Sequence, residues 1–142
     1  MKPEDSIGYL IRRTGRGMRN MIQAKLKEAE LDITMEQGAI LIRLGINDGC
    51  SQNELSEFLG KDKTTLTRLI DNMEDKSLLV RVSSESDKRV KLLYSSKKGK
   101  ECRLKVIQVL QSGLQEATQG IPKEDLKTTK ETLNKIFANV TA

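Results

Sequence analysis

Residues 51–95 read SQNELSEFLGKDKTTLTRLIDNMEDKSLLVRVSSESDKRVKLLYS, and this stretch decides the fold. Ser51 followed by Glu54 is a capping-box pattern, which predicts a short helix over Asn53 to Leu59. Gly60 stands just past the end of that helix, where glycine readily takes the left-handed conformation that closes it. The pattern therefore predicts a helix of about two turns.

A second helix is predicted from Lys63 to Lys76, with Asp62 as its N-cap. Its apolar residues form a single stripe: Leu66, Leu69, Ile70 and Met73. The turn Gly60-Lys61-Asp62 joins the two helices, and two helices joined by a three-residue turn with glycine are typical of a helix-turn-helix.

Two strands are predicted directly after this motif, Leu79 to Ser83 and Val90 to Tyr94, because both are rich in apolar and β-branched residues. The polar stretch between them, residues 84–89, is the predicted turn of a hairpin. A hairpin that follows a helix-turn-helix makes a winged helix, so the predicted fold class is mainly α with a small β-hairpin wing.

Helices are also predicted on both sides of this unit. Apolar residues recur with helical spacing from Ile7 to Ala29, and Thr34 with Gln37 is another capping box, before a helix that ends ahead of the Asn47-Asp48-Gly49 turn. Ser96 is the predicted N-cap of a long helix to about Ala117, and a last helix follows Pro122. These segments extend the winged helix-turn-helix at both ends.

The composition is polar for a compact monomer. The 142 residues are 37% hydrophobic and 32% charged, without tryptophan, so apolar surface that one copy leaves uncovered is expected to be covered by a second copy. No apolar run of 18 residues and no apolar segment after the first Met-Lys is present, and we therefore expect a cytoplasmic protein that contacts no membrane.

The positive charge is concentrated in one third of the chain. The formal net charge is +5, and residues 61–105 contain 13 Lys and Arg against 7 Asp and Glu, a net of +6. The remaining residues carry a net of −1, because 12 basic residues face 13 acidic ones. This distribution favours a polyanionic partner at the predicted winged helix.

The second helix of the motif carries the candidate residues for reading DNA: Lys63, Thr64, Thr65, Thr67 and Arg68. A helix fits the major groove, where Arg68 can donate two hydrogen bonds to guanine, and Thr64 or Thr65 can meet a thymine methyl group or a phosphate. The alternative is an ordinary solvated helix face. Three threonines favour the DNA-binding interpretation, because threonine is a mediocre helix former.

The hairpin carries the candidate wing contacts Lys88, Arg89 and Lys91, which can approach a minor groove. Asp87 would be repelled by DNA, and its predicted role is structural, as a cap of the turn that holds an arginine. The alternative is a charged hairpin tip that only keeps a sheet edge soluble. Ser51 and Gln52, at the start of the first helix of the motif, are the candidate phosphate contacts.

Nothing in the sequence supports catalysis, a cofactor or a metal site. Histidine is absent, and no glycine-rich phosphate loop occurs. Cys50 precedes a helix N-terminus, where a thiolate would be favoured, so a thiol redox sensor is an alternative function. Cys102 is expected to pack as a small hydrophobe.

Several of these motifs together resemble the MarR family of bacterial transcriptional regulators. The resemblance rests on the run from Leu59 to Lys76, on Ser86-Asp87-Lys88-Arg89 as the D-x-R wing motif, and on Ser96-Lys97-Lys98-Gly99 as the opening of the long helix. It implies two winged helix-turn-helix lobes in a homodimer joined by the N- and C-terminal helices. It also implies a palindromic operator, and a repressor released by a small phenolic or other lipophilic effector.

Under this resemblance, residues 1–32 form an N-terminal dimerisation helix, 33–95 the DNA-binding domain and 96–142 the C-terminal dimerisation helices. Two positions depart from the family pattern. Gly38 replaces a bulky residue, which is expected to enlarge or soften the region between the dimer helices and the DNA-binding lobe. Ser77 replaces a glycine in a left-handed turn, which is expected to be strained or remodelled there. A protein-interaction module built on the winged helix is the other alternative function.

Overall fold

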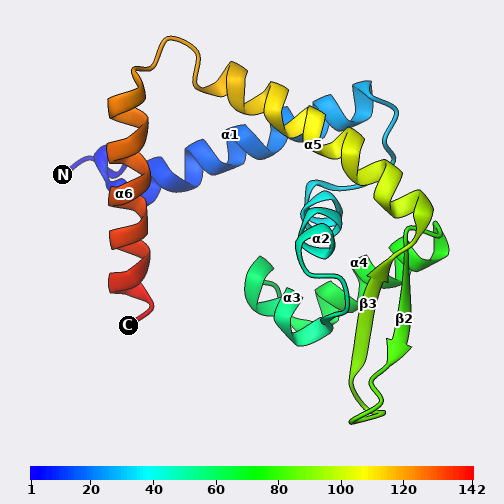
Figure 1. The fold of residues 1–142 in the computed structure, drawn as a ribbon. Helices are drawn as coiled ribbons and strands as arrows, with labels where there is room; N and C mark the ends of the chain where they lie inside the picture. Colours follow the sequence, from blue (N-terminus) through cyan, green and yellow to red (C-terminus); the bar gives the residue numbers. More distant parts are fainter.

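The computed structural model describes residues 1–142 and confirms the predicted winged helix (Figure 1). In chain order, the elements are a short 3-10 turn (Pro3–Asp5), α1 (Ile7–Glu28), α2 (Met35–Ile46), β1 (Cys50–Ser51), α3 (Gln52–Leu59), α4 (Lys63–Asp75), β2 (Leu79–Ser83), β3 (Lys91–Ser95), α5 (Lys97–Ala117) and α6 (Lys123–Val140). The long helices α1 and α5 pack together, and the lobe formed by α2, α3, α4 and the sheet is attached to them through α2.

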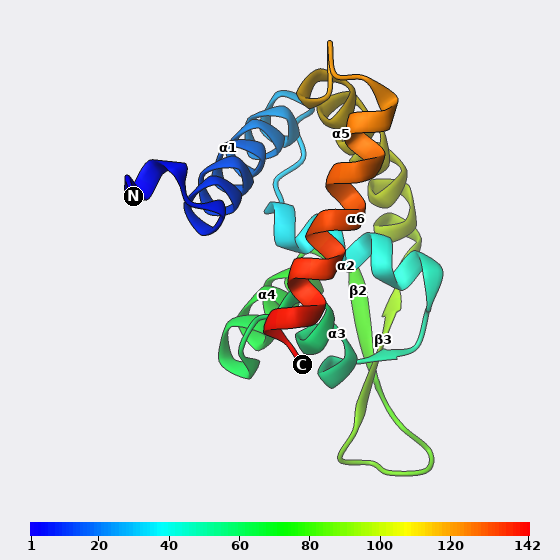
Figure 2. The same cartoon turned by 90° about the vertical axis from the view of Figure 1, so that its left-hand side faces the viewer.

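The tip of the β2–β3 hairpin points away from α1, whereas the other end of β3 runs into the start of α5 (Figures 1 and 2). Helix α6 leaves the end of α5 and has no buried residue. Its apolar side chains, which include Leu133, Phe137 and Val140, are exposed. The chain therefore consists of a compact winged-helix lobe and a set of helices that is only partly covered.

The sheet has three antiparallel strands in the order β1-β3-β2, one strand more than the predicted hairpin. Strand β1 pairs Cys50 with Leu93 and Ser51 with Leu92. It has only two residues, too few for an alternating pattern to show in the sequence. Strand β3 begins at Lys91 rather than at the predicted Val90, whose N–H closes the turn by donating to the Asp87 carbonyl at 2.9 Å.

Side-chain caps begin most of the helices, largely as predicted. Thr34 and Gln37 form both hydrogen bonds of a capping box at α2, and Asp62 and Ser96 cap α4 and α5. At α3 the predicted box forms only in half: Ser51 Oγ accepts from the Glu54 N–H at 3.1 Å, but the Glu54 carboxylate is turned toward the Cys50 thiol, 3.3 Å away.

The hydrophobic core joins the lobe to the long helices. Ile40, Leu41 and Leu44 from α2 are fully buried among side chains of α1, α4, α5 and the sheet. Gly38 lies in this contact, where an added Cβ would come within 3.1 Å of Cγ1 of Val106 in α5. The expectation that Gly38 enlarges the region is therefore wrong, because the missing side chain lets α5 pack directly against α2.

The turn after α4 is held tightly against the start of α5. Ser77 has a φ of 61°, so the left-handed turn predicted at this non-glycine position is present. The Ser96 N–H donates to the Leu78 carbonyl at 3.1 Å. A Cβ added at Gly99 would overlap that same carbonyl oxygen. Glycine is thus required at this close approach of the two backbones.

Candidate nucleic-acid interface

Helix α4 presents a polar face on the outside of the lobe. Lys63, Thr64 and Arg68 are exposed, and their side chains form no hydrogen bond or ion pair within the chain. Thr65 is half-buried beside the Asp62 cap, where its N–H donates to Asp62 Oδ1 at 2.7 Å. That hydrogen bond lowers the pKa of Asp62 below its ordinary value. The first two turns of α4 therefore offer unpaired cationic and hydroxyl groups to a ligand.

Thr67 and Gln52 are used within the lobe. The Thr67 hydroxyl donates to the Lys63 carbonyl at 2.8 Å and accepts from Gln52 Nε2 at 2.7 Å. This contact ties the start of α3 to α4 and leaves Gln52 one N–H for an outside acceptor. Ser51, the other candidate phosphate contact, is occupied as the cap of α3.

Arg81 of β2 is a functional candidate that the sequence reasoning missed. Its guanidinium, with 21% of the side chain exposed, pairs with Asp71 and lies 3.0 Å from the carboxylate of Glu74. Both carboxylates are on α4 and partly exposed. Arg81 thus fixes the wing to α4 and neutralises acidic groups next to the candidate DNA-reading residues. The place of Arg81 in a strand of alternating apolar and polar residues was a signal in the sequence. Its ion-pair partners on α4 are apparent only from the fold.

The wing is organised around Asp87 and Arg89, as predicted. Asp87 Oδ1 accepts hydrogen bonds from the Arg89 backbone N–H at 3.1 Å and from its Nε at 3.2 Å. These bonds lower the pKa of Asp87. Lys88 is exposed without a partner, while Lys91 Nζ donates to Ser83 Oγ at 2.7 Å across the strands. The hairpin therefore presents one free lysine and an arginine that is 91% exposed in its side chain.

The cysteines do not support a reactive thiol. Cys50 is completely buried, and burial, together with the hydrogen bond to Glu54, raises its pKa to about 11. The expectation that the helix N-terminus favours a Cys50 thiolate is therefore wrong, because desolvation outweighs it. Cys102 packs half-buried against the core, as predicted, and burial raises its pKa as well.

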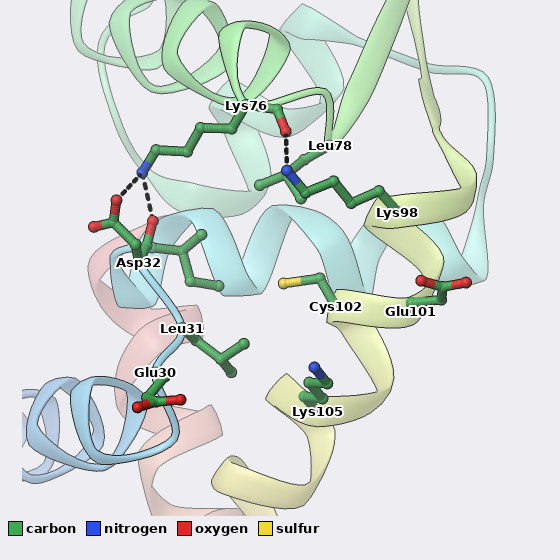
Figure 3. A pocket seen from close by; sticks show the side chains of 10 residues that line it. Glu30, Leu31, Asp32, Lys76, Leu78, Lys98, Glu101, Cys102 and Lys105 are labelled. Atoms are coloured by element: carbon green, nitrogen blue, oxygen red, sulfur yellow. Dashed lines mark hydrogen bonds and ion pairs between the residues drawn. The ribbon is translucent and has the colours of Figure 1, made fainter.

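A pocket of about 470 Å³ lies between the linker after α1, the end of α4 and helix α5 (Figure 3). Its apolar lining consists of Leu31, Ile33, Leu78 and Cys102, and its charged lining of Glu30, Asp32, Lys76, Lys98, Glu101 and Lys105. Lys76 pairs with Asp32 at 3.3 Å, and Lys98 donates to the Lys76 carbonyl at 2.9 Å. Lys105 has no partner in the chain, so the pocket combines an apolar wall with one free cation.

No group of three or more Cys, Asp and Glu side chains is placed to hold a metal ion. None of the helices has the length and apolar character needed to cross a membrane.

Known proteins match this chain in sequence and in fold. Residues 33–91 match the model of the MarR family. The uncharacterized HTH-type transcriptional regulator YybA of Bacillus subtilis (strain 168) is 27% identical over 111 residues, which cover 78% of this chain and 74% of that protein.

Two solved structures share the architecture over nearly the whole length. A MarR transcriptional regulator from Methanosarcina mazei Go1 superposes with a TM-score of 0.83 at 24% identity, covering 95% of this chain and 96% of that one. BpsR from Bordetella bronchiseptica, whose DNA binding is regulated by 6-hydroxynicotinic acid, superposes with a TM-score of 0.87 at 18% identity and covers 96% of each chain.

Proposed function

We propose that this chain is a transcriptional regulator of the MarR family, a homodimeric repressor that binds a palindromic DNA operator and is released by a small molecule. One observation carries this proposal: Arg68 and its neighbours on α4 stand exposed and unpaired beside a cationic wing. In this arrangement α4 enters the major groove and the wing reaches the adjoining minor groove.

A second copy of the chain is the proposed partner of the uncovered helices. Phe137 and Val140 on α6 are 67% and 75% exposed, and Ile7 and Ile11 on α1 are 57% and 42% exposed. Most of the stability of a helix in a protein comes from packing of its apolar face, and α6 has no buried residue, so it needs another surface to pack against. Residues 1–32 and 96–142 are the proposed dimerisation segments, and two-fold symmetry then matches a palindromic site.

The pocket beside Lys105 is the proposed effector site. Its volume lies within the range of small-molecule sites, and its apolar wall suits an aromatic or lipophilic group. The free ammonium of Lys105 suits a carboxylate on that group. BpsR, whose DNA binding responds to an aromatic acid, supports this class of ligand. A ligand there would contact both α5 and the end of α4.

Selection of bound sequences from a random pool of duplexes tests the proposal. We expect a palindromic consensus, and we expect binding to weaken by orders of magnitude between 50 and 200 mM salt if six or more phosphates are contacted. Adding aromatic carboxylates to the complex should then release the DNA. No retention of any duplex would overturn the proposal and favour a protein-interaction module instead.

A further inference from the structure

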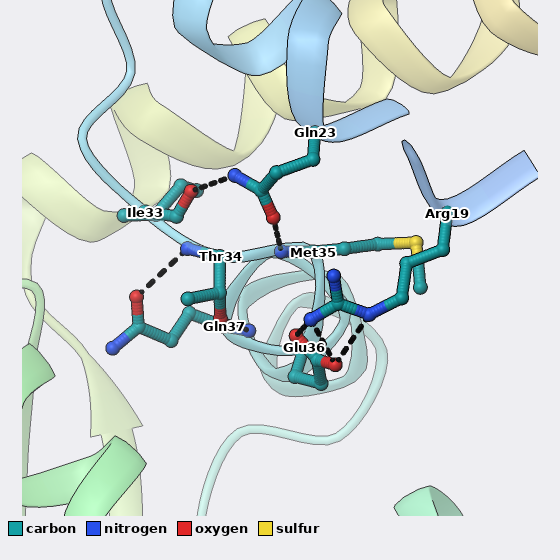
Figure 4. Close-up of polar contacts among 7 residues, drawn as sticks. All are labelled: Arg19, Gln23, Ile33, Thr34, Met35, Glu36 and Gln37. Atoms are coloured by element: carbon teal, nitrogen blue, oxygen red, sulfur yellow. Dashed lines mark hydrogen bonds and ion pairs between the residues drawn. The ribbon is translucent and has the colours of Figure 1, made fainter. Parts of the chain in front are cut away.

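A network of side-chain amides joins α1 to α4 through α2. Gln23 of α1 holds the linker in front of α2: its Nε2 donates to the Ile33 carbonyl and its Oε1 accepts from the Met35 N–H, both at 3.0 Å (Figure 4). On the other side, Gln37 of α2 donates to Asn72 of α4. We call Gln23, Gln37 and Asn72 the amide network. It connects the long helices to the candidate DNA-reading helix.

Gln37 is the only buried polar or charged side chain of the protein, with 3% exposure. Its Nε2 donates to Asn72 Oδ1 at 2.8 Å and to the Leu69 carbonyl at 3.3 Å, and its Oε1 accepts from the Thr34 N–H at 3.0 Å. Both donor hydrogens are therefore used. An apolar residue would fill this space without the free-energy cost of burying an amide. The benefit of Gln37 is therefore that its hydrogen bonds have a fixed direction.

A second contact holds α1 to α2 next to this network. The Arg19 guanidinium donates to both carboxylate oxygens of Glu36, at 2.7 and 2.9 Å (Figure 4). Partial burial by itself raises the pKa of Glu36, but the hydrogen bond from Arg19 outweighs it with the help of the backbone, and the pKa is below its ordinary value. With α1 fixed to α2 in this way, the bonds from Gln37 add a polar connection from α1 to α4 beside the apolar packing of Leu66, Ile70 and Met73.

We infer that Gln37 is a positioning residue that sets the separation of the two α4 helices in the dimer, and thereby the half-site spacing that the protein accepts. The inference rests on the proposed function, because only a dimer joined through its long helices converts the α1-to-α4 geometry into a spacing. The two helices must lie about 34 Å apart, or a multiple of it, to enter successive major grooves. The hydrogen bonds to the Leu69 carbonyl and to Asn72 require a definite distance and direction between α2 and α4, which apolar contacts specify less strictly.

The test compares three variants on duplexes whose half-sites are moved apart or together by one base pair. Gln37→Met removes both hydrogen bonds from α2 to α4, and Asn72→Ala removes the shorter of the two. Thr34→Ala is the matched control, because it removes the other half of the same capping box and leaves the Gln37–Asn72 hydrogen bond in place. Wild type should prefer one spacing, and this preference should fall by about threefold or more in the first two variants and stay unchanged in the control.

Affinity for a duplex with a single half-site should stay within about twofold of wild type in all three variants, since none alters the exposed face of the first turns of α4. An unchanged spacing preference in both Gln37→Met and Asn72→Ala would overturn the inference. An equal fall of the spacing preference in Thr34→Ala would also overturn the inference, because the loss of the α2 cap would then explain the effect. Failure of wild type to bind any duplex would instead contradict the proposed function.

Discussion

The guanidinium of Arg81 in β2 lies 3.0 Å from the carboxylate of Glu74 in α4 and pairs with Asp71 one turn earlier. One strand residue therefore connects the wing to the candidate DNA-reading helix and neutralises two acidic groups on it. Without Arg81, these carboxylates would face an approaching phosphate backbone unpaired.

Arg81→Ala should weaken binding to operator and to random duplexes alike, by about fivefold or roughly 1 kcal/mol. The variant leaves the carboxylates of Asp71 and Glu74 without their cation and loosens the wing. Neither effect depends on base sequence. Fluorescence anisotropy with both duplexes measures the effect. A triple variant, Asp71→Asn with Glu74→Gln and Arg81→Gln, should recover most of the loss; no recovery would argue that the charges are irrelevant.

Arg68→Ala should lower operator affinity by about 1 to 3 kcal/mol and relax the base preference at one position of each half-site. The side chain is exposed and unpaired, so the free energy of unfolding should not change. Lys91→Ala is the comparison: it should weaken all sequences alike with a shallower salt dependence. Equal losses on operator and random DNA for Arg68→Ala would contradict base reading.

Phe137→Glu should convert the proposed dimer to a monomer of 16.0 kDa, because it places a charge in the apolar stripe of α6. Sedimentation equilibrium measures the mass directly. Lys135→Glu, a change of charge on the exposed side of the same helix two residues before Phe137, should leave the proposed dimer intact. A Phe137→Glu protein of unchanged mass would show that α6 is not part of the interface.

Cys50 should resist alkylation in the folded protein. With a pKa of about 11, roughly one thiol in a thousand is ionised at pH 8, against about a tenth for a cysteine with the ordinary pKa of 9.0. Iodoacetamide labelling followed by peptide mass spectrometry should show slow reaction of Cys50 in buffer and fast reaction in denaturant. Rapid labelling of the folded protein would restore the redox alternative.

The same thiol should make folding sensitive to alkaline pH. A pKa raised on folding means that the neutral thiol is favoured in the folded state, so its contribution to stability is complete below the ordinary pKa of 9.0 and is lost as pH rises through about 11. The melting temperature of wild type should therefore fall more steeply over this range than that of Cys50→Val. Parallel curves would contradict the shift.

The caps and stripes of the winged helix were predictable, because each depends on residues three or four positions apart. Asp62, Ser96 and the Asp87–Arg89 turn all occur as the sequence predicts. The tertiary contacts were not predictable in this way. Gln37 satisfies a local capping box, so nothing local indicates that its remaining N–H groups bind α4, 32 and 35 residues away.

Gly38 shows the opposite kind of error. Its lack of a side chain was interpreted as empty space, whereas the structure fills that space with Val106. A missing Cβ in a core can mean a void or a closer approach of two backbones, and only the distance between α2 and α5 distinguishes the two. The two-residue strand β1 was missed because it is defined by its partner β3 rather than by its own composition.

The overlap that any Cβ at Gly99 would have with the Leu78 carbonyl oxygen has a mechanical consequence. The end of α4 and the start of α5 cannot slide past each other there, so this joint acts as a fixed pivot of the subunit. In the proposed dimer, an effector that changes the separation of the two winged-helix lobes would then have to bend α5 further along its length or move the linker after α1. Replacing Gly99 with alanine should consequently disturb the contact between the Leu78 carbonyl and the start of α5. The rest of α5 and the linker after α1 should move as freely as before.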